Sequence, residues 1–156
     1  MHSNNLISTI RWIGRPNDLI HILSGQDELQ NIDYLILNFH GDDGRFCLNE
    51  LADEVYEKDE PRIKFFTAQN LKKVAKLNGL KVISAGCSLG AEDLAQAILQ
   101  SGAELYLAPK GYIDGNANLM FLIQFFYEIT NGKPICEAVE IARAINEETG
   151  LYQLYQ

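Results

Sequence analysis

Two short segments carry residue types that could act as a nucleophile and a base. The run Gly86-Cys87-Ser88-Leu89-Gly90 fits the GxSxG pattern of a nucleophile elbow, which would make Ser88 the nucleophile. In that arrangement the catalytic histidine follows the serine along the chain. The histidines of this chain, His2, His21 and His40, all precede Ser88. A serine hydrolase of this type, or its cysteine variant with the same residue order, therefore lacks its base.

Phosphate chemistry at the same segment is excluded by the residues that follow it. A cysteine phosphatase needs an arginine shortly after the cysteine, but Cys87 is followed within a few positions by Glu92 and Asp93. Two acids there would repel a phosphate dianion. A glycine-rich phosphate cradle is excluded as well, because no lysine follows the glycines.

Cys87 paired with His40 is the combination that remains. A thiol is a good nucleophile only as the thiolate, and a helix N-terminus and a neighbouring imidazole both favour that form. Cys87 comes just before a predicted helix that starts near Ala91, and His40 ends a predicted strand. The backbone N–H groups of Gly41 and Cys87 could stabilise an oxyanion. The pattern indicates acyl transfer by a Cys87–His40 dyad. The alternative is that both residues are structural, with Cys87 a small buried side chain and His40 a residue that only ends its strand. The sequence fixes no third acid.

The other two cysteines, Cys47 and Cys136, lack such a context. Together with Cys87 they form an odd, widely spaced set with no CxxC pair and no nearby histidine. This spacing matches neither a disulfide framework nor a zinc site. We therefore expect Cys47 and Cys136 to be structural, and we expect neither a metal ion nor a cofactor.

The elements that must position the dyad follow from hydrophobic periodicity. Apolar runs predict four strands, at residues 6–13, 34–39, 81–85 and 104–108. Helical spacing predicts a short helix at 18–23 and longer ones at about 68–77, 91–102, 116–130 and 134–146. Thr67 is expected to cap the helix at 68–77. The polar stretch from 42 to about 61 has no clear prediction.

Alternating strands and helices predict an α/β fold, a three-layer sandwich whose mostly parallel sheet is covered on both faces. In open sheets of this kind, reactive groups gather at the carboxyl ends of the strands. His40-Gly41 follows the strand at 34–39, and Gly86-Cys87-Ser88 follows the strand at 81–85. The two candidate residues are therefore expected to meet at one edge of the sheet.

Composition limits the classes of partner. The 156 residues include 13 basic and 21 acidic side chains, a net charge of −8, which disfavours nucleic acid. The length predicts a single domain over residues 1–156. No apolar run approaches the roughly 20 residues of a membrane span, and the first residues do not resemble a signal peptide. We expect a cytoplasmic protein that binds no membrane.

The order of these motifs resembles that of the caspase-like cysteine peptidases, in particular the CHAT domains and the separases. In that family a His-Gly and a Cys close successive strands of the sheet, and a further strand, a loop, a helix with an aromatic pair and a glycine turn follow. The resemblance runs from about residue 34 to 144. The matching segments here are His40-Gly41, Gly86-Cys87-Ser88, residues 97–108, Tyr112-Ile113-Asp114, Phe125-Phe126-Tyr127-Glu128, Gly132-Lys133-Pro134, Ala138 and Ala142.

This resemblance implies a caspase-hemoglobinase fold and hydrolysis of peptide bonds in a protein or peptide substrate, with Cys87 as nucleophile and His40 as base. It also implies that Asp114 could receive a basic substrate side chain. The alternative for Asp114 is that it caps the helix that follows.

Two other functions stay open at this point. The run Leu119-Met120-Phe121-Leu122-Ile123 with Phe125-Phe126-Tyr127 is apolar around most of a helix, which is typical of a core helix or of one shared with a partner. A catalytically inactive interaction module, binding a second copy or another protein, would use such a helix. A small-molecule thiol amidase would use the same Cys87–His40 pair.

Overall fold

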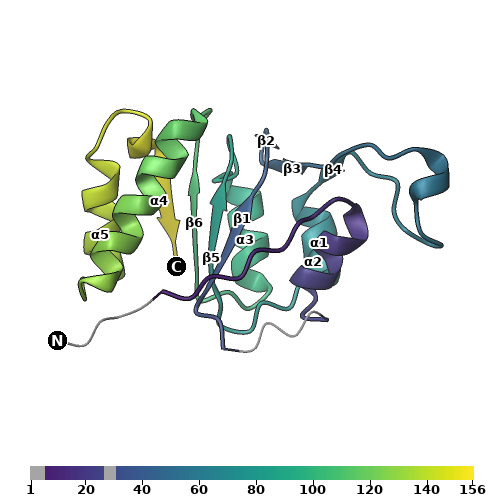
Figure 1. The fold of residues 1–156 in the computed structure, drawn as a ribbon, viewed down its shortest axis with the longest axis horizontal. Helices are drawn as coiled ribbons and strands as arrows, with labels where there is room; N and C mark the ends of the chain where they lie inside the picture. Colours follow the sequence, from purple (N-terminus) through teal and green to yellow (C-terminus); the bar gives the residue numbers. More distant parts are fainter. Residues whose placement is uncertain (1–5, 27–30) are drawn as a thin grey trace.

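The computed structural model describes residues 6–26 and 31–156. Its centre is a four-stranded sheet in the order β1-β5-β6-β7 (Figure 1). Strands β1 (Tyr34–Asn38), β5 (Lys81–Ala85) and β6 (Leu105–Pro109) run parallel, and β7 (Tyr152–Tyr155) is antiparallel to β6. The predicted α/β class with a mostly parallel sheet is therefore confirmed.

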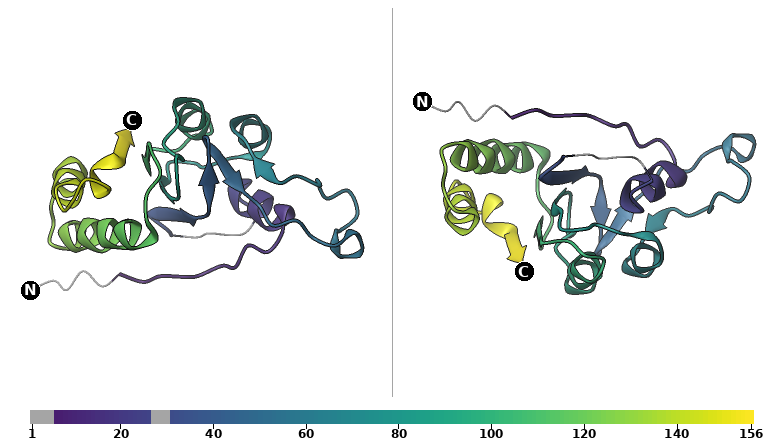
Figure 2. Two further views of the ribbon diagram at one scale, coloured as in Figure 1. Left: turned by 90° about the horizontal axis from the view of Figure 1, so that it is seen from above. Right: turned by 90° about the horizontal axis from the view of Figure 1, so that it is seen from below.

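Helices cover both faces of this sheet, which gives three layers (Figure 2). Helices α1 (Pro16–Leu23), α2 (Ala68–Val74) and α3 (Glu92–Gln100) lie on one face. Helices α4 (Gly115–Thr130) and α5 (Ile135–Arg143) lie on the other. The Thr67 hydroxyl accepts a hydrogen bond from the Asn70 N–H, so the predicted cap of α2 is confirmed.

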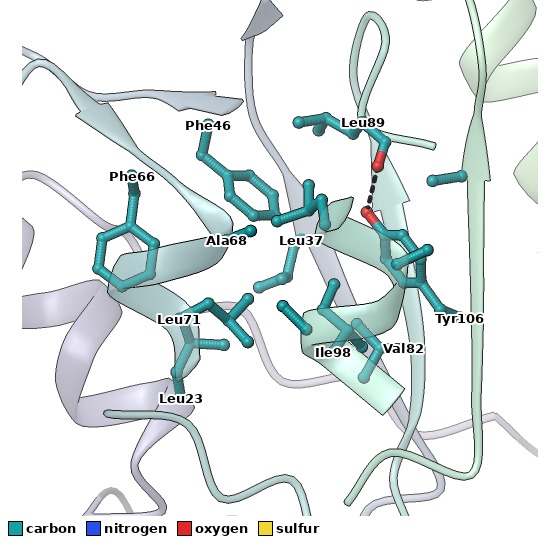
Figure 3. Close-up of a cluster of buried hydrophobic side chains, with 14 of the residues drawn as sticks. Leu23, Leu37, Phe46, Phe66, Ala68, Leu71, Val82, Leu89, Ile98 and Tyr106 are labelled. Atoms are coloured by element: carbon teal, nitrogen blue, oxygen red, sulfur yellow. Dashed lines mark hydrogen bonds between the residues drawn. The ribbon is translucent and has the colours of Figure 1, made fainter. Parts of the chain in front are cut away.

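Each face has its own apolar core because the side chains of a strand alternate between the two faces. Val82 packs toward α2 and α3, whereas its neighbour Ile83 packs toward α4 and α5. Figure 3 shows part of the first core, in which Tyr106 of β6 lies below Leu89. The second core includes Phe121 of α4, whose ring stacks on that of Tyr152 with 3.6 Å between centroids.

A small antiparallel sheet follows β1 in the stretch that had no clear prediction. It consists of β2 (Gly41–Asp42), β3 (Arg45–Cys47) and β4 (Phe65–Phe66), with a 3-10 turn η1 (Asp53–Val55) before β4. The turn between β2 and β3 is Asp43-Gly44, with φ of +47° and +71°. Two positive φ values favour an Asp-Gly pair and indicate a tight hairpin turn.

Three sequence predictions are wrong in detail. The strand predicted at residues 6–13 does not form, and Ile7 and Trp12 are 93% and 92% exposed, because no strand of the described residues lies beside this segment to pair with it. Helix α2 ends at Val74 rather than near residue 77, and α5 ends at Arg143 rather than near residue 146. Strand β7 and the 3-10 turn η2 (Thr149–Leu151) before it were not predicted.

Candidate active site

The site is built where β1 and β5 end side by side. These parallel strands pair in register from Tyr34 opposite Lys81 to Asn38 opposite Ala85. Just beyond the strands, the Phe39 N–H donates to the Ala85 carbonyl at 3.3 Å, so the pairing continues past the last strand residues. Extended two residues beyond its last pair, the same register would set the backbone of His40 beside that of Cys87.

His40 and Cys87 lie toward the same face of the sheet. The Phe39 ring packs against Phe46 in the first core, with centroids 5.4 Å apart, so alternation directs the next residue, His40, to the opposite face. Cys87 packs against the second core, which is on that opposite face. His40 is exposed and Cys87 is half-buried. The two residues that the sequence singled out therefore lie at the same edge of the sheet and toward the same face.

Two glycines allow this close approach. A Cβ atom on Gly41 would lie 2.1 Å from the Cys87 carbonyl oxygen, and one on Gly86 would lie 2.1 Å from the Phe39 carbonyl oxygen. The buried side chain of Leu89 fills the space between them, since its carbon atoms would be within 3.0 Å of either Cβ. Larger residues at 41 or 86 would force the ends of β1 and β5 apart.

The backbone leaves N–H groups at this junction. Ser88 and Gly90 donate theirs to the carbonyls of Gly111 and Pro109, at 2.9 and 2.8 Å. Within residues 6–26 and 31–156, no acceptor is found for the Cys87 N–H. The Cys47 N–H donates to the His40 carbonyl at 2.8 Å, so His40 and Cys47 form a hydrogen-bonded pair of the hairpin. Hydrogen-bonded and non-hydrogen-bonded pairs alternate in an antiparallel ladder, so the next pair, Gly41 and Phe46, is non-hydrogen-bonded. The Gly41 N–H therefore points away from β3. It points to the same side as the Phe39 N–H, which donates to β5.

The hairpin β2–β3 brings a second thiol to the site. Cys47 lies opposite His40, and opposite residues of an antiparallel pair share a face. Burial raises the pKa of the Cys47 thiol, and Asp42 and the nearby Cys87 raise it further, whereas Arg45 lowers it. Sequence reasoning did not connect Cys47 with the dyad. The signal that could have done so is the Asp43-Gly44 pair, which predicts the hairpin that folds Cys47 back.

The segment between β6 and α4 forms the other wall. The Cys87 Sγ donates to the Ile113 carbonyl at 3.4 Å. The hydroxyl of Tyr112 donates to Asp42 Oδ1 at 3.0 Å, and this bond raises the pKa of Tyr112. The Asp42 carboxylate also pairs with Arg45 at 3.0 Å. These contacts join the hairpin to the segment that touches Cys87.

Asp114 follows this wall and has a structural role. Its Oδ1 accepts a hydrogen bond from the Asn116 N–H at 2.8 Å, which caps α4, so the capping alternative is confirmed. Its own N–H donates to Glu148 at 2.8 Å. The residue is exposed and directly follows Ile113, whose carbonyl accepts from Cys87. The third cysteine, Cys136, is exposed in the first turn of α5.

Comparison with known proteins does not assign a family. No protein-family model matches the chain, and no curated protein matches its sequence significantly. In the part of the chain that the structure describes, no helix combines the length and the apolar character needed to cross a membrane.

Proposed function

We propose that this protein is a cysteine peptidase of the caspase-like type, with Cys87 as the nucleophile and His40 as the general base. The observation that supports the proposal is the register of β1 and β5, which runs to Asn38 opposite Ala85 and so leads the chain toward His40 and Cys87 at one edge of the sheet. A three-layer α/β sandwich with the candidate residues at the carboxyl edge of a mostly parallel sheet is consistent with the caspase-hemoglobinase fold.

The proposed reaction is acyl transfer through a thioester. His40 accepts the Cys87 proton as the sulfur attacks the peptide carbonyl carbon, and the N–H groups of Gly41 and Cys87 stabilise the oxyanion. The C–N bond then breaks, and the imidazolium returns the proton to the leaving amine. His40 next takes a proton from water, which attacks the thioester. The C–S bond breaks, and the thiol regains that proton.

Acidic groups around the thiol favour a substrate with a basic side chain. Asp43 and Asp114 lie on the segments that flank Cys87, whereas Asp42 is already paired with Arg45, and the chain carries a net charge of −8. Asp114 is exposed, so a lysine or arginine side chain could also reach its carboxylate. Two hollows of the described surface are lined by residues from 14–18 and 50–64, and neither is lined by Cys87. An open edge suits an extended peptide better than a buried small molecule.

A peptide acyloxymethyl ketone with a lysine next to the reactive group tests this proposal. The thiolate would displace the carboxylate leaving group and form a stable thioether to the probe. We expect Cys87→Ala to abolish labelling, whereas Cys47→Ala, which removes the neighbouring thiol, retains it. Labelling that persists without Cys87 would exclude the dyad.

A second candidate function, a protein-interaction module, is favoured by the outer face of α4. Leu119, Met120, Ile123 and Tyr127 are 57%, 44%, 62% and 61% exposed and lie on one stripe. The single charged residue of α4, Glu128, is buried and bonded to Gln124 at 2.6 Å. If a second copy covers this stripe, analytical ultracentrifugation will show a concentration-dependent dimer that Ile123→Lys dissociates. A monomer at all concentrations would count against self-association.

A further inference from the structure

The turn that carries Cys87 is held from beneath by two tyrosines of the sheet. The Tyr106 hydroxyl in β6 donates to the Leu89 carbonyl at 2.8 Å (Figure 3). The Tyr155 hydroxyl in β7 donates to the carbonyl of the next residue, Gly90. Both rings belong to the first core, whereas Cys87 packs against the second. The tyrosines therefore hold the turn on the face opposite the thiol.

This turn needs external support because its backbone is unusual. Ser88, directly after Cys87, has a φ of +56°, a conformation that L-residues with a side chain rarely adopt. Such strain persists only where the surrounding contacts fix it. The N–H group of Ser88 donates to the segment between β6 and α4, and that of Gly90 donates to Pro109, the last residue of β6. The two tyrosine hydroxyls supply the matching bonds for the carbonyls of Leu89 and Gly90.

The two tyrosines act as one unit. They are direct partners in the β6–β7 register, and their rings stack with centroids 6.1 Å apart. Lys110 Nζ lies 5.7 Å from the Tyr155 ring centroid. Burial raises the pKa of Tyr155, and Glu92 raises it further, so this hydroxyl keeps the proton that it donates. Tyr106 is fully buried, whereas Tyr155 is only partly buried, so Tyr155 is the partner that can be altered with less damage to the core.

We propose that Tyr106 and Tyr155 are positioning residues for Cys87, and that the reactivity of this thiol depends on the docking of β7 through Tyr155. The proposal rests on the proposed function only in taking Cys87 as the reactive group. Neither tyrosine touches the thiol. Each fixes a peptide carbonyl within three residues of it, and through that turn fixes the direction of the Sγ atom and of the Cys87 N–H.

Tyr155→Phe is the decisive variant, and Tyr152→Phe is its matched control. Both residues lie in β7 and both hydroxyls are hydrogen-bonded, but Tyr152 donates to Asn118 Oδ1 at 2.8 Å, on the α4 side. Tyr152 is also the more buried of the two. A general loss of stability would therefore appear at least as strongly in Tyr152→Phe, whereas a loss confined to Cys87 would appear only in Tyr155→Phe.

The readout is the rate at which iodoacetamide alkylates each cysteine of the folded full chain, followed by mass spectrometry well below the melting temperature. For Tyr155→Phe we expect the Cys87 rate to fall roughly tenfold, since small displacements of a reacting group are costly. The Cys136 rate should not change, and Tyr152→Phe should leave the Cys87 rate at the wild-type value. With the lysyl ketone, Tyr155→Phe should lower the maximal inactivation rate and leave the half-saturating concentration unchanged.

An unchanged Cys87 rate in folded Tyr155→Phe, or an equal loss in Tyr152→Phe, would overturn the proposal. If Tyr155→Phe does not fold, Tyr106→Phe serves as the second variant with the same expected loss. The iodoacetamide assay does not require peptidase activity. If Tyr155→Phe slows Cys87 alkylation but the ketone does not label Cys87, the positioning role stands and the peptidase is rejected. If the ketone labels Cys87 but Tyr155→Phe leaves its alkylation rate unchanged, only the positioning role is rejected.

Discussion

Gly41→Ala tests whether the ends of β1 and β5 must touch. The added Cβ would lie 2.1 Å from the Cys87 carbonyl oxygen and 2.6 Å from Leu89 Cγ. Neither neighbour can give way easily, because one is backbone and the other is a fully buried side chain. Overpacking of this kind costs typically about 1–3 kcal/mol, and the backbone contact sets the expectation at about 3 kcal/mol. The chain must separate at the position where His40 and Cys87 are brought together.

For a chain of this length, about 3 kcal/mol corresponds to a melting temperature lower by roughly 6–12 °C. Far-UV circular dichroism against temperature measures this directly, and iodoacetamide labelling in the same samples should show a slower reaction of Cys87. Gly115→Ala is the control, since a Cβ there meets nothing within 4 Å at the start of α4. If Gly41→Ala melts at the same temperature as Gly115→Ala, the close packing described for the site is incorrect.

Two further predictions concern the hairpin and α2. Asp42→Asn removes a negative charge that raises the pKa of Cys47, so the pH midpoint of Cys47 alkylation should move downward; an unchanged or higher midpoint would contradict the described neighbourhood. Thr67→Ala removes the acceptor of the Asn70 N–H, bonded at 3.3 Å, and should lower the free energy of unfolding by about 1 kcal/mol in urea titrations. No change in urea midpoint would mean that this cap does not stabilise α2.

The centre of the parallel sheet could be predicted because β5 and β6 are buried on both faces, whereas the edge strand β1 is partly exposed. The continuous apolar run of β5 and the helical spacing of Leu94, Ala95 and Ile98 in α3 are properties of each segment alone. Segment properties alone could not predict that residues 6–13 form no strand and that β7 does form one. Residues 6–13 have strong β-forming types but no partner in the described structure, whereas β7 is only four residues long and is a strand because β6 lies beside it.

The same distinction applies to the site. His40 and Cys87 could be predicted as neighbours because parallel strands that follow each other in sequence end at one edge. Cys47 could have been, through the hairpin that the Asp43-Gly44 pair predicts. Tyr112 and Tyr155 could not, because each reaches the site through a long-range contact. Tyr155 contacts the carbonyl of a residue 65 positions earlier, and the bond from Tyr112 to Asp42 spans 70 positions. No local pattern encodes such contacts.

The most direct test of the central claim, that His40 acts on Cys87, is the inactivation rate of His40→Gln with the lysyl ketone at neutral pH. Removal of a general base typically costs about 100- to 10,000-fold, so we expect the Cys87 reaction to slow by at least roughly 100-fold. Alkylation of Cys136 in the same sample and the far-UV spectrum should not change. A Cys87 rate equal to that of the wild type in folded His40→Gln would contradict the dyad.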